Sequence, residues 1–184
     1  MARKIYIDLG ANRGSTIRNF RRENADFIVF GFEPTPALVQ GLRSEFRGTD
    51  SNVHIMEYAA WIHDGIVNFY FGADSDQSST AIIGKRDTPG WQIDCKVPYR
   101  AAAIDFDRWF RENTSDDDYI IIKMDVEGAE YKLLRRMLDS GSIKRVKEAR
   151  IEWHWNRYPL EVTEAQHNML REQLAAITNV VDWE

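Results

Sequence analysis

Two acids and two glycines stand in this chain where a nucleotide-like cofactor could be held. Asp8 ends a short apolar run, and Gly10 and Gly14 follow it in a turn. Glu33 ends the next apolar run. A strand that leads through a glycine-rich turn into a helix presents backbone N–H groups to a ligand. Because an acid after the second strand can accept hydrogen bonds from ribose hydroxyls, the spacing predicts a nucleotide-type cofactor site.

The turn between Asp8 and Gly14 narrows the class of cofactor. A dinucleotide fingerprint has glycine at three positions because the backbone must approach a pyrophosphate closely. Here Asn12 takes the place of the second glycine, and the carboxylate of Asp8 would repel a pyrophosphate. A carboxylate suits instead a cofactor with a cationic amino-acid end, such as S-adenosylmethionine. An ordinary strand-to-helix turn is the alternative interpretation, because a single motif is a weak signal.

A second group of chemically capable residues follows later apolar runs. Asp125 ends the most strand-like run of the chain. Glu152 and His154 alternate with tryptophans, so they are expected on one face of a later strand. Histidine exchanges a proton near neutral pH, so His154 could act as a general base that Glu152 orients. Asp125, Glu152 and His154 could instead ligate a divalent metal ion, and the sequence leaves both interpretations open.

The acids of this group also have structural interpretations. Glu127 and Glu130 are expected in the first turn of a helix over residues 127–138. Acids there complement the helix dipole, and this pair resembles a capping box. Glu152 and His154 could likewise be a hydrogen-bonded pair without a chemical role, because structural ion pairs often resemble sites.

Strand and helix patterns alternate along the chain and predict a doubly wound, mostly parallel α/β sheet. Runs 65–72 and 92–100 are expected to pair as an inserted β-hairpin. The other expected strands are 4–8, 27–33, 53–60, 119–125, 146–154 and 180–183. The expected helices are 15–22, 36–46, 104–111, 127–138 and 163–177. Ligands bind beyond the carboxyl ends of strands in such sheets, and the acids named above all fall there.

Bulk properties exclude several classes of protein. The length of the chain, 1–184, suits one domain with its own core. The net charge of −5 argues against a dedicated nucleic-acid binder. Cys95 is the only cysteine, so no disulfide can form within the chain, which fits a reducing compartment. Because no apolar run could cross a bilayer and no signal peptide precedes the first strand, a cytoplasmic protein without membrane contact is expected.

Five segments resemble the FkbM family of S-adenosylmethionine-dependent methyltransferases. The most specific is Ile-Lys-Met-Asp-Val-Glu-Gly-Ala-Glu at 122–130, and Glu-Trp-His at 152–154 resembles the acid-x-His that ends the next strand in that family. The others are 8–14, 32–34 and 103–107. The resemblance implies a class I methyltransferase fold, Rossmann-like, in one domain that is minimal at both ends. It also implies methyl transfer to a hydroxyl oxygen, often of a sugar or another small molecule.

The resemblance further implies roles for single residues. Ser79 lies in a serine segment that is common near the cofactor in the family, although a solvated loop is the alternative. Asp125 would face the sulfonium and, with Glu127, Glu152 and His154, would act on the acceptor. The remaining cofactor contacts implied are Asp8 and Gly10 for the methionine part, Asn12 and Gly14 for the shape of the turn, Glu33 for the ribose, and Ala60 and Trp61 for the adenine.

Three other functions compete with this interpretation. A nucleic-acid methyltransferase would need a proline-aromatic segment after the strand that ends at Asp125, and Val-Glu-Gly follows instead. A nicotinamide oxidoreductase is disfavoured by Asn12 and by the absence of a Tyr-x-x-x-Lys segment on a helix. A cofactor-binding protein with lost catalysis stays open, because fold alone does not establish function. The acceptor, the oligomeric state and the need for a metal are not determined by the sequence.

Overall fold

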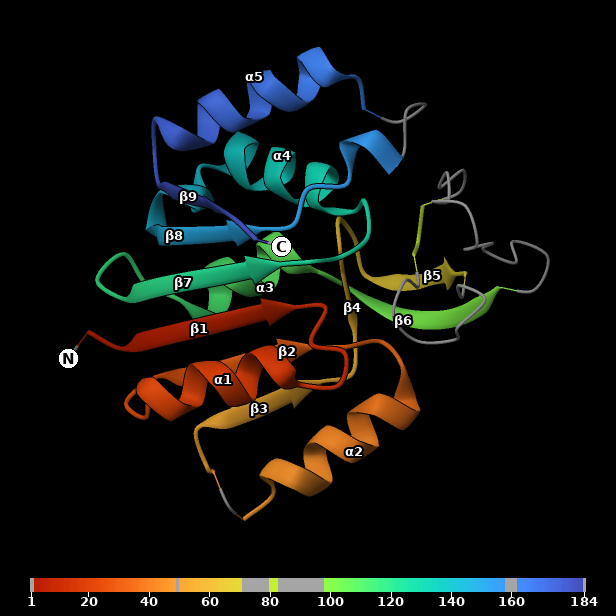
Figure 1. The fold of residues 1–184 in the computed structure, drawn as a ribbon, viewed down its shortest axis with the longest axis vertical. Coiled ribbons are helices and arrows are strands. Elements are labelled where there is room, and N and C mark those ends of the chain that lie inside the picture. Colours follow the sequence, from red (N-terminus) through yellow and green to blue (C-terminus); the bar gives the residue numbers. More distant parts are fainter. Residues whose placement is uncertain (1, 49, 71–79, 83–97, 158–161, 184) are drawn as a thin grey trace.

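The computed structural model describes residues 2–48, 50–70, 80–82, 98–157 and 162–183. Six strands form one sheet in the order β3-β2-β1-β7-β8-β9, and every neighbouring pair is parallel (Figure 1). These strands are β1 (Lys4–Leu9), β2 (Ile28–Phe32), β3 (Val53–Met56), β7 (Tyr119–Met124), β8 (Val146–Ile151) and β9 (Asn179–Asp182). The α-helices are α1 (Ser15–Glu23), α2 (Pro36–Phe46), α3 (Phe106–Asn113), α4 (Glu130–Ser140) and α5 (Glu164–Ala175). None of these helices is long and apolar enough to cross a membrane.

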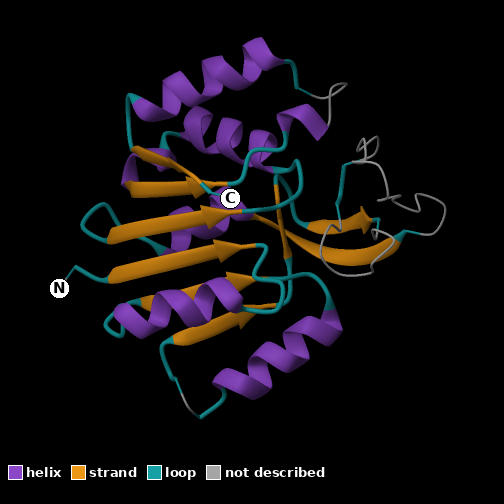
Figure 2. Cartoon of the chain, viewed as in Figure 1, coloured by secondary structure: helices purple, strands orange, loops and turns teal. Residues whose placement is uncertain are grey.

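Helices cover both faces of the sheet (Figure 2). On one face, Ile17 and Phe20 of α1 and Leu42 of α2 share a core with Tyr6 and Val29 of the strands. On the other face, a larger core joins side chains of α3, α4 and α5 to β1, β7 and β8. Because β1 and β7 lie in the middle, all but the first residue of each is buried. The expected doubly wound α/β fold is therefore confirmed.

A smaller sheet lies beyond the carboxyl ends of the main strands (Figure 1). It contains β4 (Ala59–Trp61), β5 (Gly65–Phe69) and β6 (Tyr99–Asp105) in the order β4-β6-β5. β5 and β6 are antiparallel, with Phe69 opposite Tyr99 and Gly65 opposite Ala103. Most of the expected run 92–100 lies outside the described residues, so this pairing includes only the end of that run. β4 runs parallel to β6 and leads directly out of the main sheet. The small sheet thus brings residues far apart in the chain to the edge where a ligand would bind.

Several predicted boundaries are wrong, and each has a local cause. The expected strand 53–60 divides after Met56, because β2 ends at Phe32 and offers no further partner. The expected strand 146–154 ends at Ile151 for the same reason, since its partner β7 ends at Met124. The expected helix 104–111 begins later, because its first two residues pair with β4 in the small sheet.

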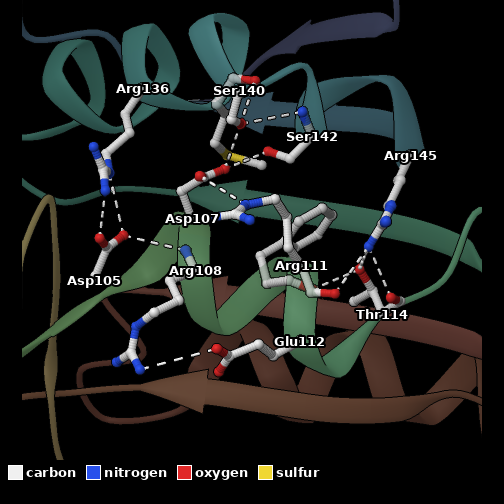
Figure 3. Close-up of polar contacts among 12 residues, drawn as sticks. Asp105, Asp107, Arg108, Arg111, Glu112, Thr114, Arg136, Ser140, Ser142 and Arg145 are labelled. Carbon is white, nitrogen blue, oxygen red and sulfur yellow. Dashed lines mark hydrogen bonds and ion pairs between the residues drawn. The ribbon is translucent and has the colours of Figure 1, made fainter.

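The segment 103–107 ties α3 to α4 through buried acids (Figure 3). Asp105 accepts a hydrogen bond from the backbone N–H of Arg108 at 3.1 Å, which caps α3, and pairs with Arg136 of α4. Asp107 is 3 % exposed and accepts from Ser140 Oγ at 2.8 Å. These acids therefore hold two helices on one face of the sheet.

Candidate active site

The turn after β1 requires its glycines. Gly10, Asn12 and Gly14 all have positive φ, at 84°, 47° and 78°. A Cβ on Gly10 would lie 2.0 Å from the carbonyl oxygen of Asp125, so no larger residue fits beside β7. The left-handed turn brings the chain into α1, which begins directly after Gly14.

Glu33 holds this turn from the end of β2. Its side chain is 5 % exposed, and Oε2 accepts a hydrogen bond from the backbone N–H of Asn12 at 2.9 Å. Oε1 accepts from the backbone N–H of Thr35, also at 2.9 Å. Burial raises the pKa of Glu33, while these hydrogen bonds act in the opposite direction. The Thr35 side chain also hydrogen-bonds to this carboxylate. A carboxylate has about four acceptor positions, so Glu33 keeps capacity for a hydrogen bond from a ribose hydroxyl.

One pocket collects most of the predicted cofactor residues. It lies between the carboxyl ends of the main strands and the small sheet, and Phe32, Val126 and Phe69 give it apolar walls. Gly14 is not in its lining, and Ser79 lies outside the described residues. The predicted residues that line it are Gly10, Asn12, Glu33, Ala60, Trp61, Asp125 and Glu127.

Asp8 lies beneath this pocket rather than on its wall. Its side chain is fully buried, and Oδ1 lies 3.3 Å from Nζ of Lys123. Burial raises the pKa of Asp8 to about 6, although the charge of Lys123 acts in the opposite direction. Asp8 therefore faces a buried lysine, a partner that the sequence pattern did not reveal.

Lys123 connects the two strands that carry the acids. Its Nζ donates to the carbonyl oxygen of Gly10 at 3.2 Å and lies 3.3 Å from Oδ2 of Asp125. Burial opposes the charge of Lys123, but Asp8 and Asp125 outweigh it and raise the pKa of the amine. The signal in the sequence was a single charged residue within the apolar strand β7. Lys123 thus fixes the turn and Asp125 relative to each other.

The second group of candidate residues meets around the imidazole of His154. Asp125, Glu127 and His154 each place one donor atom within 4.8 Å of the others. His154 is fully buried, and its Nδ1 lies 3.0 Å from Oε1 of Glu130. The same oxygen accepts from the backbone N–H of His154 at 3.0 Å. Glu130 therefore fixes the orientation of the ring.

The other ring nitrogen faces more carboxylates. Nε2 of His154 lies 3.4 Å from Oε2 of Glu127 and 3.4 Å from Oε1 of Glu152. Burial lowers the pKa of His154, but contacts with Glu130 and Glu152 and the charge of Glu127 outweigh burial and raise it to about 10. These carboxylates therefore favour the protonated form of the His154 imidazole. It can accept a proton only after losing the one it holds.

The predicted alternation of side chains continues in residues 152–155, after β8 has ended. Glu152 turns toward the ring of His154, which also faces Glu127. Trp153 and Trp155 instead pack against the ring of His167, with centroid distances of 5.0 and 5.5 Å. The tryptophans thus form an aromatic support behind the acidic group.

The chain between Asp125 and α4 explains how Glu127 reaches this group. Glu127 and Gly128 have φ of 52° and 104°, so they lie outside the helix. The capping-box interpretation is wrong, because α4 begins only at Glu130 and has no side-chain cap. Oε2 of Glu130 accepts instead from the backbone N–H of Gly128 at 2.9 Å, and Thr80 Oγ1 donates to the carbonyl of Glu127 at 2.7 Å. The Thr80 contact spans distant parts of the chain, and no local pattern in the sequence points to it.

The fold and the site together define a class of protein. A parallel sheet of this order, with a left-handed turn after β1 and a buried acid after β2, is a Rossmann-like fold. The model of the methyltransferase FkbM domain matches residues 8–178, so the chain belongs to the FkbM methyltransferase family. Its fold is therefore that of the Rossmann-like methyltransferases. The comparisons with curated proteins and with solved structures give no match.

Proposed function

We propose that this methyltransferase transfers the methyl group of S-adenosylmethionine to a hydroxyl oxygen of a small molecule, sugar or glycan. One observation carries the proposal. Asp125 and Glu127 line the pocket and also lie beside the buried imidazole of His154. A methyl donor in the pocket would therefore lie next to groups that can activate an alcohol.

The pocket residues fit the parts of this cofactor. The carboxylate of Glu33 has capacity left for a ribose hydroxyl, and Ala60 and Trp61 offer apolar surface to the adenine. The carboxylate of Asp125 suits the cationic methionine end. Asp8 would act through Lys123 rather than by direct contact, since its side chain is fully buried.

S-adenosylmethionine supplies a methyl group that is already activated by its sulfonium. The oxygen–carbon bond of the product forms as the carbon–sulfur bond breaks, so alignment of the two partners contributes much of the rate. The turn and Glu33 would hold the donor, and the acidic group would face the acceptor. The hydroxyl proton would leave to a carboxylate of the acidic group, because a protonated alcohol is a weak nucleophile.

Calorimetric titration with S-adenosylmethionine and, separately, with NAD tests the proposal. Saturable binding of S-adenosylmethionine alone is expected, followed by methyl transfer from labelled cofactor to a panel of sugars and small alcohols. Binding of neither compound, or of NAD alone, would overturn the proposal. Binding without transfer to any acceptor would favour a cofactor-binding protein that has lost catalysis.

A further inference from the structure

Three side chains of metal-ligating type converge beside the cofactor pocket. Asp125 and Glu127 follow β7, and His154 follows β8. Their donor atoms lie within 4.8 Å of one another. Glu152, which the sequence placed in such a set, approaches Nε2 of His154 but is not part of this group. The left-handed backbone at Glu127 brings that residue to the group in its place.

The imidazole of His154 supplies an independent observation. The ring is fully buried, and Nε2 makes no hydrogen bond to any described residue, although two carboxylate oxygens lie 3.4 Å away. Nδ1 lies 3.0 Å from Glu130, whose carboxylate is an acceptor, so Nδ1 is the nitrogen that donates. When a metal ion takes the place of the second proton, Nε2 presents its lone pair toward Asp125 and Glu127. Metal-binding histidines are commonly held in this way by a carboxylate on the other ring nitrogen.

The charges around the group favour a cation. Lys123 lies 3.3 Å from Asp125, and Arg157 lies 3.8 Å from Glu127 at the exposed side. Lys123 is also shared with the buried Asp8. Even with a protonated His154, these side chains leave a surplus of negative charge, because the carboxylates around them are Asp8, Asp125, Glu127, Glu130 and Glu152.

We propose that Asp125, Glu127 and His154 bind one divalent transition-metal ion, with Glu130 as the residue that positions the imidazole. One nitrogen and two carboxylate oxygens suit Mn²⁺ or a similar ion better than Mg²⁺ or Ca²⁺, which favour oxygen ligands alone. The role of this ion rests on the proposed function. An ion held at the pocket wall would bind the acceptor hydroxyl and make it more acidic.

Titration of the full chain with Mn²⁺, after removal of metals by a chelator, tests the site. Free Mn²⁺ is followed by electron paramagnetic resonance, and one saturable site per chain is expected. Asp125→Asn should lower the affinity at least about tenfold, because a ligand is lost. Its side chain is partly exposed, so this variant is expected to fold. Glu164→Gln, at an exposed acid of α5, is the matched control and should bind as the unmodified chain does.

The variant Glu130→Gln tests whether Glu130 positions the imidazole for metal binding or only stabilises the fold. It should weaken Mn²⁺ binding by about 10- to 100-fold while the stoichiometry stays the same. Thermal unfolding without metal shows whether the variant is folded. A folded Glu130→Gln variant with unchanged Mn²⁺ affinity would remove Glu130 from the proposal.

Calorimetry with S-adenosylmethionine keeps the two proposals apart. If the chain binds S-adenosylmethionine but no Mn²⁺, or if Asp125→Asn binds Mn²⁺ unchanged, the metal site is wrong and the proposed function stands. If the chain binds Mn²⁺ but no S-adenosylmethionine, the metal site stands and the proposed function fails.

Discussion

At the scale of single residues, Gly10 is constrained twice, by its left-handed φ of 84° and by the carbonyl of Asp125. Gly10→Ala should therefore destabilise the chain and abolish cofactor binding. Gly48→Ala is the matched control, because Gly48 has φ of 75° but nothing within 4 Å of a Cβ. That control should cost only about 1–2 kcal/mol from its backbone conformation. Urea unfolding compares the two variants, and equal losses would contradict the close-approach argument.

Glu33 accepts two backbone hydrogen bonds, and an amide can replace only one of its oxygens. Glu33→Gln leaves one partly buried N–H, of Asn12 or Thr35, without its acceptor. The expected cost is about 1–3 kcal/mol of unfolding free energy. We also expect a loss of affinity for S-adenosylmethionine, measured by calorimetry. Glu57→Gln, at an exposed ion pair with Arg43, should change stability by less than about 0.5 kcal/mol.

A substitution of His154 should slow methyl transfer without weakening cofactor binding. The reason is that its side chain lies behind the wall of the pocket rather than in its lining. His154→Gln is expected to keep its affinity for S-adenosylmethionine and to slow methyl transfer by about 10²- to 10⁴-fold. Calorimetry and single-turnover transfer measure the two properties. Transfer at an undiminished rate in a folded variant would remove His154 from the chemistry.

At the scale of elements, Arg3 and Asp118 join the starts of β1 and β7, opposite the site. Asp118 is buried and accepts from Arg3 and from the backbone N–H of Ser115, and the Arg3 hydrogen bond holds its pKa well below the usual range. Because the folded pKa is lower than the unfolded value of about 3.9, this contribution to stability is complete above about pH 4. It is lost as the pH falls toward the folded pKa.

Asp118→Asn should therefore cost about 1–3 kcal/mol at neutral pH. Its difference from the unmodified chain should narrow near about pH 3. Urea unfolding at the two pH values measures this. Asp116→Asn is the control, because Asp116 pairs with Arg145 but is 86 % exposed. A pH-independent cost at Asp118 would contradict the assigned cause.

The positions of helices and strands could be predicted wherever apolar residues recur at a regular spacing. The helix 36–46 has the predicted bounds, and the apolar run that forms β7 is the buried central strand expected. The ends of elements could not be predicted, because a strand stops where its neighbour stops. β8 ends at Ile151, opposite the last residue of β7, Met124. α4 begins later than predicted because Glu127 has a left-handed backbone, and this conformation brings its side chain to the site.

At the scale of the whole molecule, the sheet has a protected centre and two exposed edges. Within the part of the chain that the structure describes, β1 and β7 each have a strand on both sides, whereas β3 and β9 each have one. We expect amide hydrogen exchange to be slowest in β1 and β7 and faster in β3 and β9. Mass spectrometry of exchanged peptides checks this order. Equal protection in β3 and β7 would contradict it.

The site itself could be predicted in part, because parallel strands bring their carboxyl ends to one edge. From the strand pattern alone, that rule placed Asp8, Glu33, Asp125 and His154 near one another. The rule did not show which of these residues line the pocket and which lie beneath it. Asp8 pairs with Lys123 below the turn, and Glu130 holds His154 from α4, since such contacts depend on packing between distant segments.

The sequence by itself determined the fold class and the family, because periodicity and the glycine turn are local properties of the chain. It also determined which chemical groups stand at the ends of strands. Only the tertiary structure decided which of them meet. Glu127 joins Asp125 and His154 through a backbone conformation that no local pattern encodes, and the contact of Nδ1 with Glu130 decides which nitrogen of His154 faces them.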